Sequence, residues 1–334
     1  MKSTTDTRWD SSELSNALPP MDWNDLAEIS AAQQRYLNHY KIDFSSTYKN
    51  KGFSHHIGSF SAAGYDLAAQ VFSQDSAKGT ALLMHGYYDH VGIYGSLINF
   101  CLQQGWNVFA FDLPGHGLSS GERASISSFR EYDQVFCAAL DRAKEFQLQT
   151  KSESLPLHVF GQSTGGAIII NYLLTRSIQQ SDSVFASVNL LAPLVRPTGW
   201  FKAKIMHSVL RPFIQQIKRS FSLNSDDLEF LKFISERDPL QPLSLSVSWV
   251  GALKKWVRMI EASTPVDLDI NIVQGSNDDT VEWRHNMPLL AEKFPNRKLF
   301  MLEGGRHQLV NEAPAKREQV YQWLQQQIAL GTTE

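Results

Sequence analysis

The hydrophobic pattern changes character near residue 80. From there, short runs in which almost every residue is apolar alternate with stretches whose apolar residues recur every three or four positions, as over 129–146 and 167–174. The short runs cover residues 80–84, 108–111, 157–160, 188–191, 268–273 and 298–302. Strands that are apolar at nearly every position are buried on both faces, as in a parallel sheet covered by helices. The alternation predicts an α/β fold with a mostly parallel central sheet flanked by helices.

The first 80 residues have a different pattern. Residues 1–21 are polar and end in Pro19-Pro20, which predicts a flexible arm. Asp22 is expected to cap a helix that continues to about Tyr40. Its apolar side would carry Trp23, Leu26, Ile29 and Tyr36. Alternation over 56–60 and 65–72 predicts two further strands, joined by a turn at Ala63-Gly64.

One connection is far longer than the others. About 70 residues separate the run that ends near Leu191 from the run that begins near Leu268, well beyond an ordinary loop. We interpret this segment as an inserted cap of two or three amphipathic helices. The apolar positions of the first are Trp200, Ile205, Met206, Val209, Phe213 and Ile217. Residues 194–260 contain 11 Lys and Arg but only 5 Asp and Glu, so the insertion is basic in a mildly acidic chain.

These patterns suggest a division of the chain into four parts. Residues 1–50 form an N-terminal arm and helix, and residues 51–193 form the first part of an α/β core. Residues 194–262 form the helical cap, and residues 263–334 complete the core.

Composition narrows the class of protein. The 334 residues carry a net charge of −3 and are 43% hydrophobic, which allows a large core and excludes general disorder. A mildly acidic chain has no general attraction for nucleic acid. The N-terminus has no secretory h-region and no run approaches a membrane-spanning length, so we expect a cytoplasmic protein. Cys101 and Cys137 are too few for a disulfide or zinc framework and are expected to be reduced core thiols.

The strongest chemical signal is Gly161-Gln162-Ser163-Thr164-Gly165. It follows the apolar run 157–160 directly and precedes the helical stretch 167–174, which is the strand–turn–helix setting of a nucleophile elbow. Such a turn is tight, and Gly161 and Gly165 leave it room. The simpler alternative is a glycine- and serine-rich turn of any α/β protein. In its context the motif makes Ser163 the candidate nucleophile.

A serine hydroxyl needs a base, and the base needs an orienting carboxylate. In this fold they follow the serine in the order acid, then histidine, after later strands. Asp278 and Asp279 follow the run 268–273, and His307 follows the run 298–302. Taken singly, the acidic pair could be a polar turn and His307 an exposed loop histidine. Their order and context favour a Ser163–aspartate–His307 triad, with Asp278 and Asp279 both open.

An ester or amide carbonyl also needs backbone N–H donors for the oxygen that becomes negative. One donor is expected from the residue after the nucleophile, Thr164. The second should come from the loop after the run 80–84, where His85-Gly86 precedes Tyr87. Tyr87 is therefore the second predicted donor.

Taken together, these motifs resemble the α/β-hydrolase superfamily, in the branch of monoacylglycerol lipases, lysophospholipases and serine aminopeptidases. The matching residues are His85-Gly86, 112–119 (DLPGHGLS), 161–165, 275–281 and 304–307. The resemblance implies an α/β-hydrolase fold, selects Asp278 because 275–281 matches GxxDxxV, and assigns loop-shaping roles to His85 and His116. Residues 1–50 match nothing in the family core, and the cap matches only in position and helical character.

Other chemistries fit less well. The glycine-rich segment 115–121 imitates a dinucleotide-binding loop, but Pro114 and a polar stretch delay the helix that such a loop requires. His85, His90 and His116 lack the spacing of known metal motifs. A pseudo-hydrolase scaffold or receptor usually lacks one triad member, and this chain has all three.

We therefore expect a serine hydrolase that cleaves carboxylic esters through an acyl-enzyme, without metal or cofactor. The substrate is expected to be lipid-like, a monoacylglycerol or lysophospholipid, or another ester with an apolar acyl chain. A small-ester carboxylesterase and an aminopeptidase or amidase are the alternatives. The basic cap could touch an anionic membrane surface transiently, or could simply have a solvated outer face and an apolar inner one.

Overall fold

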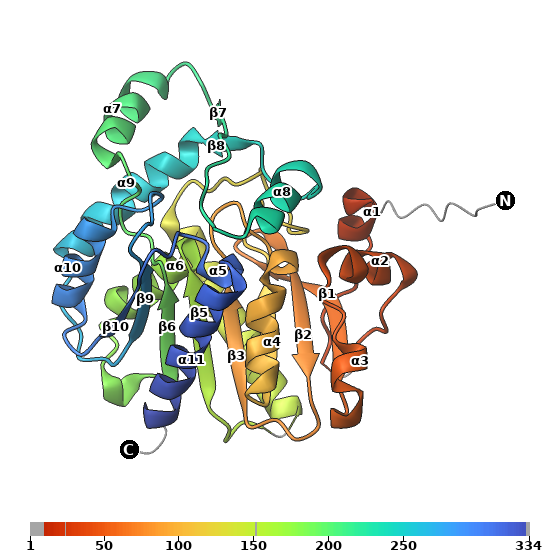
Figure 1. Cartoon of the computed structure of the whole chain (residues 1–334). Coiled ribbons are helices and arrows are strands. Elements are labelled where there is room, and N and C mark those ends of the chain that lie inside the picture. Colours follow the sequence, from red (N-terminus) through yellow and green to blue (C-terminus); the bar gives the residue numbers. More distant parts are fainter. Residues whose placement is uncertain (1–9, 24, 151, 332–334) are drawn as a thin grey trace.

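A single eight-stranded β-sheet organises the part of the chain that the computed structural model describes, residues 10–23, 25–150 and 152–331 (Figure 1). Its strands are β1 (Ser54–Ala62), β2 (Tyr65–Ser73), β3 (Gly79–Met84), β4 (Trp106–Phe111), β5 (Leu157–Gln162), β6 (Ser187–Leu191), β9 (Asn271–Gly275) and β10 (Lys298–Leu302). Their order across the sheet is β1-β2-β4-β3-β5-β6-β9-β10. The pairs β1–β2 and β2–β4 are antiparallel and all others are parallel, which confirms the predicted sheet.

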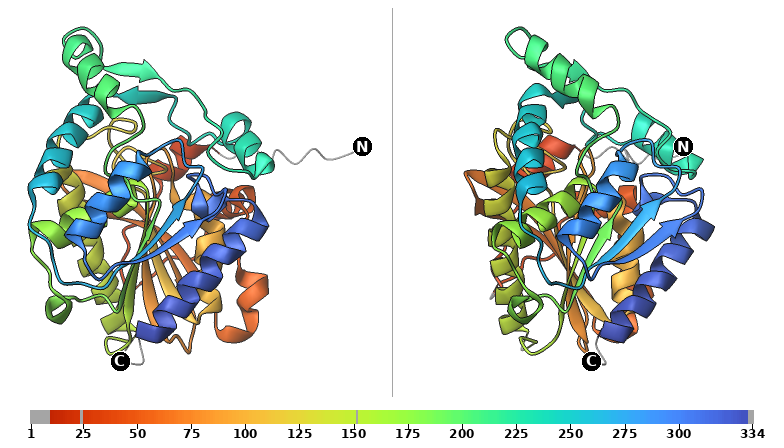
Figure 2. Two further views of the ribbon diagram at one scale, coloured as in Figure 1. Left: turned by 60° about the vertical axis from the view of Figure 1, so that its left-hand side comes forward. Right: turned by 90° about the vertical axis from the view of Figure 1, so that its left-hand side faces the viewer.

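Helices cover both faces of this sheet, as the two turned views show (Figure 2). The helices of the core are α4 (Gly95–Gln103), α5 (Phe129–Gln149), α6 (Thr164–Thr175), α10 (Trp283–Lys293) and α11 (Pro314–Gly331). Along β3, Leu82 and Met84 pack in one hydrophobic cluster with α5 and α6, whereas Ala81 and Leu83 pack in another with α4 and α11. The inner strands are thus buried on both faces and largely apolar, because alternate side chains enter different cores.

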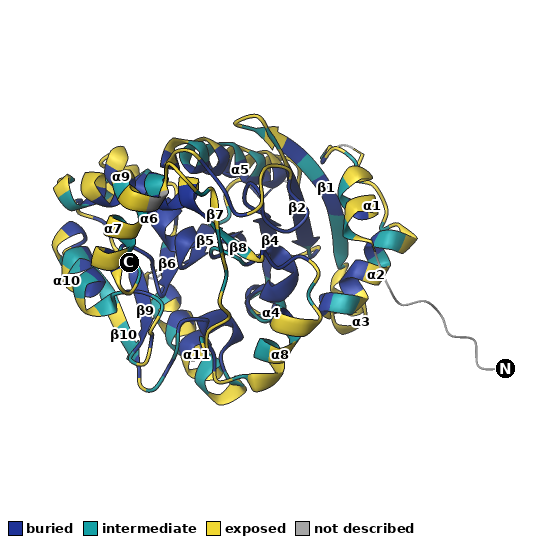
Figure 3. Ribbon diagram, turned by 90° about the horizontal axis from the view of Figure 1, so that it is seen from above, coloured by how far each residue is buried: buried dark blue, intermediate teal, exposed yellow. Residues whose placement is uncertain are grey.

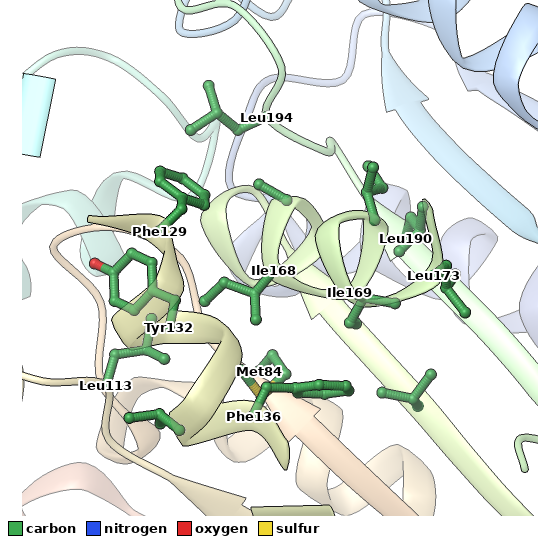
Figure 4. Packing of buried hydrophobic residues seen from close by; sticks show 14 of the residues in the cluster. Met84, Leu113, Phe129, Tyr132, Phe136, Ile168, Ile169, Leu173, Leu190 and Leu194 are labelled. Atoms are coloured by element: carbon green, nitrogen blue, oxygen red, sulfur yellow. The ribbon is translucent and has the colours of Figure 1, made fainter. Parts of the chain in front are cut away.

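The helices α5 and α6 pack against each other on one side of the sheet. Figure 4 shows Phe136 and Tyr132 of α5 facing Ile168 and Ile169 of α6. All four side chains have no exposed surface. Figure 3 shows the same distribution from above, with dark buried strands at the centre and exposed positions on the outer sides of the helices.

The order of the strands fixes where a site can form. From β3 the chain passes through α4 to β4 on one side, and from β5 it passes through α6 to β6 on the other. The strands β3 and β5 are neighbours, and the chain leaves them in opposite directions along the sheet. A crevice therefore opens beyond their carboxyl ends. The elbow at Ser163 and the loop after Met84 both lie at this crevice.

The N-terminal region differs from its prediction. No helix starts at Asp22: α2 (Ala31–Tyr40) begins after Ser30, whose hydroxyl accepts from the N–H of Gln33 while the Gln33 side chain accepts from the N–H of Ser30. This capping box is a stronger start signal than Asp22. Trp23 lies in a non-helical segment and packs against Phe146 of α5, with ring centroids 5.3 Å apart.

The predicted flexible arm is also partly wrong. Residues 1–9 lie outside the described residues, but α1 (Ser11–Asn16) follows them and buries Leu14. Pro20 then forms a β-bridge with Ser59 of β1, and Met21 is buried in the core. The next helical segments are α3 (Ser45–Tyr48) and the single turn η1 (Lys49–Lys51). The polar composition of this region hid a few apolar anchors that hold it against β1.

The predicted strand over 268–273 is displaced. The strand β9 begins only at Asn271, which pairs with Lys298 of β10, and it continues to Gly275. Leu268 and Ile270 are buried without belonging to the strand. Apolar character marked the burial of this segment, while the pairing with β10 set the start of the strand.

The long insertion contains more than helices. Between β6 and β9 lie α7 (Trp200–Leu210), β7 (Gln216–Lys218), α8 (Leu228–Glu236), β8 (Ser244–Ser246) and α9 (Val247–Ala262), and β7 pairs with β8. The predicted first amphipathic helix is therefore too long, since α7 ends at Leu210. Its apolar residues also do not share one buried face: Trp200 is buried, but Phe201 is 71% and Val209 60% exposed. Figure 2 shows α7 projecting from the molecule.

Three short turns of 3-10 helix complete the described structure, η2 (Val91–Tyr94), η3 (Gln180–Asp182) and η4 (Leu309–Asn311). Both cysteines are free; Cys101 is buried, whereas Cys137 is only half-buried, beside Arg176. Among the described residues, no helix combines the length and apolar character needed to cross a membrane.

The packing of α6 against β3 generates a stability prediction. A methyl group on Gly165 would lie 2.2 Å from the carbonyl oxygen of Met84, so Gly165→Ala should force the helix away from the strand. Overpacking of this kind costs about 1–3 kcal/mol, more than the helix propensity that alanine adds. We expect the urea midpoint of unfolding to fall. Gly331→Ala is the matched control. Gly165 lies in the first turn of α6, and Gly331 is the last residue of α11, where no atom lies within 4 Å of the added methyl. Equal midpoints for the two variants would contradict this packing.

Candidate active site

Ser163 occupies the sharp turn between β5 and α6. Its backbone angles are φ 52° and ψ −111°, in a region that a residue with a Cβ rarely adopts. Hydrogen bonds hold the turn: the Ser163 N–H donates to Leu191 O (2.9 Å), and the Leu194 N–H donates to Ser163 O (3.1 Å). The neighbouring strand β6 and the segment after it thereby fix the turn in its unfavourable conformation.

The glycines of the motif make this turn possible. A methyl group on Gly161 would lie 2.6 Å from the carbonyl carbon of Gly165. The strand and the helix therefore touch backbone to backbone at these two positions. This contact turns the chain sharply enough to leave the Ser163 side chain at the crevice.

The predicted residues Ser163, His307 and Asp278 form one chain of hydrogen bonds. His307 Nε2 lies 2.9 Å from Ser163 Oγ, and His307 Nδ1 lies 2.8 Å from Asp278 Oδ2. All three residues are buried. Asp279 is exposed, so the structure brings Asp278 and not its neighbour to the histidine.

The carboxylate of Asp278 is held by groups on its own loop. Its Oδ1 accepts from the N–H groups of Thr280 (2.8 Å) and Val281 (3.1 Å), and its Oδ2 accepts from Gln274 Nε2 (2.9 Å). Burial alone would raise the pKa of Asp278, but the facing His307 and these donors outweigh burial and lower it. The carboxylate is therefore ionised beside the imidazole.

The pKa of His307 moves in the opposite direction. Burial would lower it, but the Asp278 carboxylate and its hydrogen bond to Nδ1 outweigh burial and raise the pKa above the ordinary value of 6.5. Gln162 Nε2 also donates to the backbone carbonyl of His307 (2.8 Å). With Nδ1–H directed to Asp278, the Nε2 lone pair faces the serine hydroxyl, which is the tautomer that a general base requires.

The predicted oxyanion donors lie next to this chain. A methyl group on Gly86 would be 3.3 Å from Ser163 Cβ, so the loop after β3 passes directly beside the nucleophile. Among the described residues, no group accepts a hydrogen bond from the backbone N–H of Tyr87 or of Thr164. Buried N–H groups are normally paired. Two free donors beside a serine fit the binding of a negative oxygen.

His85 and His116 take part in loop structure. The Leu113 N–H donates to His85 Nε2 (2.8 Å), so His85 carries its proton on Nδ1 and donates it to Gly86 O (2.7 Å). Burial lowers the pKa of both histidines, to about 4 for His116. Their neutral rings join the loop after β3 to the loop after β4.

The other chemistries considered from the sequence find no support in the geometry. The glycine-rich segment 115–121 is not followed by a helix until α5 begins at Phe129. In the part of the chain that the structure describes, no cluster of three or more His, Cys, Asp or Glu side chains could hold a metal ion.

Sequence reasoning missed the second layer of this site. Asp89 accepts from Tyr94 Oη (2.9 Å) and from Gln308 Nε2 (2.8 Å), which joins the loop after β3 to the residue after His307. His90 pairs with Asp238 of the insertion at 2.9 Å. An acidic residue and a histidine, five and six positions after the end of β3, were the available local signals, but their partners lie far away in the sequence.

Comparisons with known proteins show which family the chain belongs to. Residues 75–314, more than two thirds of the chain, match the model of the family described as "Serine aminopeptidase, S33". The chain is 28% identical over 272 residues to human monoglyceride lipase, covering 77% of this chain and 85% of that one. It is 24% identical to phospholipase YtpA of Bacillus subtilis, covering 74% of this chain and 93% of that one.

A similar fold is found in a crystal structure of a soluble variant of monoglyceride lipase from Saccharomyces cerevisiae, in complex with a substrate analog. The two share a TM-score of 0.71 and 17% identity, over 82% of this chain and 94% of that one. On the extent of the family match, the chain belongs to the serine aminopeptidase S33 family; its fold is that of the α/β-hydrolases, and its sequence is similar to those of monoglyceride lipases.

Proposed function

We propose that the protein is a serine hydrolase that cleaves carboxylic esters through an acyl-enzyme. The observation that carries this proposal is the hydrogen-bonded chain from Asp278 through His307 to Ser163, beside the free N–H groups of Tyr87 and Thr164. This combination supplies a nucleophile, a base, an orienting acid and an oxyanion site within one crevice. The chain of residues generates its own nucleophile, so the proposed reaction draws on no metal ion or cofactor.

The proposed reaction begins when Ser163 Oγ attacks the ester carbonyl carbon and His307 Nε2 takes the hydroxyl proton. The carbonyl oxygen becomes negative and accepts from the N–H groups of Tyr87 and Thr164, while Asp278 stabilises the imidazolium. The tetrahedral intermediate collapses, and the leaving alcohol takes the proton from His307. Water then attacks the acyl-enzyme, again giving a proton to His307. The second collapse releases the carboxylic acid and returns this proton to Ser163.

The surroundings of the serine favour a substrate with an apolar acyl chain. The insertion contributes buried Trp200, Trp249 and Leu253 to the same hydrophobic cluster as Leu194, the residue whose N–H donates to Ser163 O. Trp249 stacks on Tyr87 with ring centroids 3.9 Å apart. The names of the relatives, monoglyceride lipase and phospholipase, support lipid-like esters. A monoacylglycerol or a lysophospholipid is the substrate class we propose.

The test of this function is hydrolysis of p-nitrophenyl esters from acetate to palmitate by the wild-type protein and by Ser163→Ala. We expect the wild type to prefer medium or long acyl chains, and the variant to lose at least about 10⁴-fold in kcat. Ser235→Ala is the matched control, because that hydroxyl bonds only to carbonyls of its own helix α8. Its kcat should equal that of the wild type.

Other outcomes of the ester series have defined meanings. Activity confined to acetate and butyrate would replace the lipid-like substrate with a small ester. Activity of Ser163→Ala within tenfold of the wild type would refute the nucleophile. Ser163-dependent cleavage of aminoacyl amides with no ester cleavage would indicate an aminopeptidase or amidase.

The pKa shifts predict the pH profile. His307 must be unprotonated to accept the serine proton, and Asp278 raises its pKa, so kcat/KM should increase with pH with a midpoint above 6.5. Asp278→Asn removes the negative charge and leaves the effect of burial, so the midpoint should move to lower pH while kcat falls by about 10⁴. The measurement is kcat/KM of both proteins from pH 4.5 to 9.

Asp279→Asn is the control for this experiment. Asp279 is exposed one position away and touches neither Ser163 nor His307, so its profile should superimpose on that of the wild type. A larger loss in Asp279→Asn than in Asp278→Asn would move the acid by one residue.

We also propose that the insertion contacts an anionic membrane surface. On α7, Phe201, Ile205, Met206 and Val209 are between 50% and 71% exposed, an unusual accumulation for one short helix. Beside them, a cavity of about 910 Å³ between α7 and α9 is lined by five basic side chains, those of His207, Arg211, Lys254, Lys255 and Arg258.

The charge in this cavity is not balanced within it. Glu122 is its acidic side chain, and among the described residues none of the four lysines and arginines forms an ion pair. The neighbouring Lys254 and Arg211 add to burial in lowering the pKa of His207. Uncompensated cations next to exposed apolar side chains match the headgroup and acyl layers of an anionic bilayer.

This contact predicts lipid-dependent binding. The wild type should bind vesicles that contain phosphatidylcholine and phosphatidylglycerol. It should bind vesicles of phosphatidylcholine alone much more weakly. The triple variant Lys254→Gln, Lys255→Gln, Arg258→Gln should bind the anionic vesicles about a hundredfold more weakly, at about 1 kcal/mol per cation. Phe201→Ser should weaken binding to both vesicles. The measurement is co-sedimentation over a range of lipid concentrations.

Two matched controls lie on α5, away from the insertion. Lys144→Gln removes an exposed cation there, and Leu148→Ser removes a side chain that is 60% exposed. Both should bind as the wild type does. Equal binding of the triple variant and Lys144→Gln to anionic vesicles would refute the membrane contact.

A further inference from the structure

Three segments that are distant in the sequence meet at one buried ion pair. His90 ends the loop of residues 85–90, which we name the oxyanion loop because it carries the N–H of Tyr87. His90 Nε2 lies 2.9 Å from Oδ2 of Asp238, which follows α8 in the insertion. Tyr40, the last residue of α2, donates its hydroxyl to Asp238 Oδ1 at 2.6 Å. The N-terminal region, the insertion and the oxyanion loop are thus joined at one carboxylate.

The Asp238 carboxylate is buried and accepts hydrogen bonds from four groups. Neither the His90 nor the Asp238 side chain has any exposed surface. Besides His90 and Tyr40, the side chain of Gln241 (2.8 Å) and the N–H of Leu240 (3.0 Å) donate to Asp238. Burial would raise the pKa of Asp238, but His90 and these donors lower it to about 2. Asp238 in turn raises the pKa of His90 despite the burial of the ring. Removal of one partner would leave the other buried without its counter-charge.

The oxyanion loop needs such an anchor because its backbone is strained. Tyr88 has φ 72°, in the left-handed region that disfavours a large side chain. Strained residues persist only where the surroundings hold them. The loop starts at the end of β3, and beyond its last residue the Val91 N–H donates to Asp112 (2.7 Å). Between these fixed ends, the Asp89 N–H donates to Gly86 O (3.1 Å) and closes a turn around Tyr88, and side-chain contacts hold this turn in place.

Those contacts fall on both sides of Tyr88. Before it, the Gly86 N–H donates to Tyr94 Oη (2.9 Å). After it, Asp89 is held by Tyr94 and Gln308, and His90 by Asp238. The ring of Tyr88 itself lies under the guanidinium of Arg219 from the insertion, 4.0 Å from the ring centroid. The Tyr87 N–H belongs to the peptide group between Gly86 and Tyr87. A change in the backbone of this turn would rotate that group and redirect the N–H.

We propose that Asp238, acting through His90 and supported by Tyr40, is a positioning residue that keeps the Tyr87 N–H directed at the reacting carbonyl oxygen. This inference rests on the proposed function. It gives the N-terminal region and the insertion a part in catalysis, which they exert through the oxyanion loop. The contact acts on the transition state and not on the binding of the ester, because the donor meets the oxygen only when that oxygen is negative.

The test compares Asp238→Asn and Tyr40→Phe with the wild type on one p-nitrophenyl ester. We expect Asp238→Asn to lower kcat by about tenfold to a hundredfold, within the range for an impaired oxyanion donor, with KM changed less than twofold. Tyr40→Phe should lower kcat about threefold to tenfold. The affinity for a trifluoromethyl ketone, which forms an oxyanion adduct with Ser163, should fall in parallel with kcat.

Two matched variants separate positioning from general damage. Tyr48→Phe removes a tyrosine hydroxyl from the same N-terminal region, where it bonds to Asn99 (2.7 Å) and not to the loop. Glu261→Gln breaks another ion pair of the insertion, with Arg196. Both should keep the kcat and the ketone affinity of the wild type. Hydrogen exchange of the peptide that spans residues 85–90 should be faster in Asp238→Asn and Tyr40→Phe, and unchanged in the two controls.

The outcomes distinguish this inference from the proposed function. If wild-type turnover does not depend on Ser163, the proposed function fails and the inference falls with it. If turnover depends on Ser163 but Asp238→Asn and Tyr40→Phe keep kcat and ketone affinity within twofold of the wild type, only the inference is overturned. If Asp238→Asn does not fold, Tyr40→Phe against Tyr48→Phe decides it, since each removes a single hydroxyl.

Discussion

The backbone contact between α6 and the ends of β3 and β5 is the constraint on which the site depends. Gly161 and Gly165 let the helix start against the strands with no side chain between them, and the turn at Ser163 has to adopt a positive φ to accommodate this. The same turn places the Thr164 N–H at the first position of α6, where the helix itself supplies no acceptor, and it has none among the described residues. Nucleophile and oxyanion donor are thus two results of one packing requirement. The unfavourable backbone is compensated by the buried apolar surface of α6, most of whose residues have no exposed area.

The sequence was informative wherever neighbouring residues alone determine the structure. Inner strands are largely apolar because both faces of the sheet are covered, so the runs along β3, β5 and β6 could be found without knowledge of their partners. The residues of the candidate site could also be located, since each follows a strand within a few positions. Where several partners compete, local pattern was insufficient. The helix α2 begins at the capping box of Ser30 and not at Asp22. The start of β9 is set by its pairing with Lys298 of β10.

The contacts that join the insertion to the N-terminal region and to the oxyanion loop could not be predicted from the sequence. His90 and Asp238 are 148 positions apart, and Tyr40 and Asp238 are 198 apart. No periodicity or motif relates such positions, because the pairing depends on how the insertion folds back over the sheet. The exposed apolar side of α7 is a similar case: its spacing is that of a buried face, and only the structure shows that nothing in the described chain covers Phe201 or Val209.

The insertion supports the loops of the site as well as covering them. Ser225 Oγ donates to Asn311 O (2.7 Å) and the Gln308 N–H donates to Asn224 O (2.8 Å), so the segment before α8 fixes the residues that follow His307. The segment after α8 fixes the oxyanion loop through Asp238. Lifting the insertion as one body would separate a buried ion pair, at a cost of several kcal/mol, and would release both loops together. Ser163 is only 7% exposed, so a substrate needs some opening. Among the described residues of α7, none makes these contacts with the two loops, so a displacement of α7 alone would leave both loops in place.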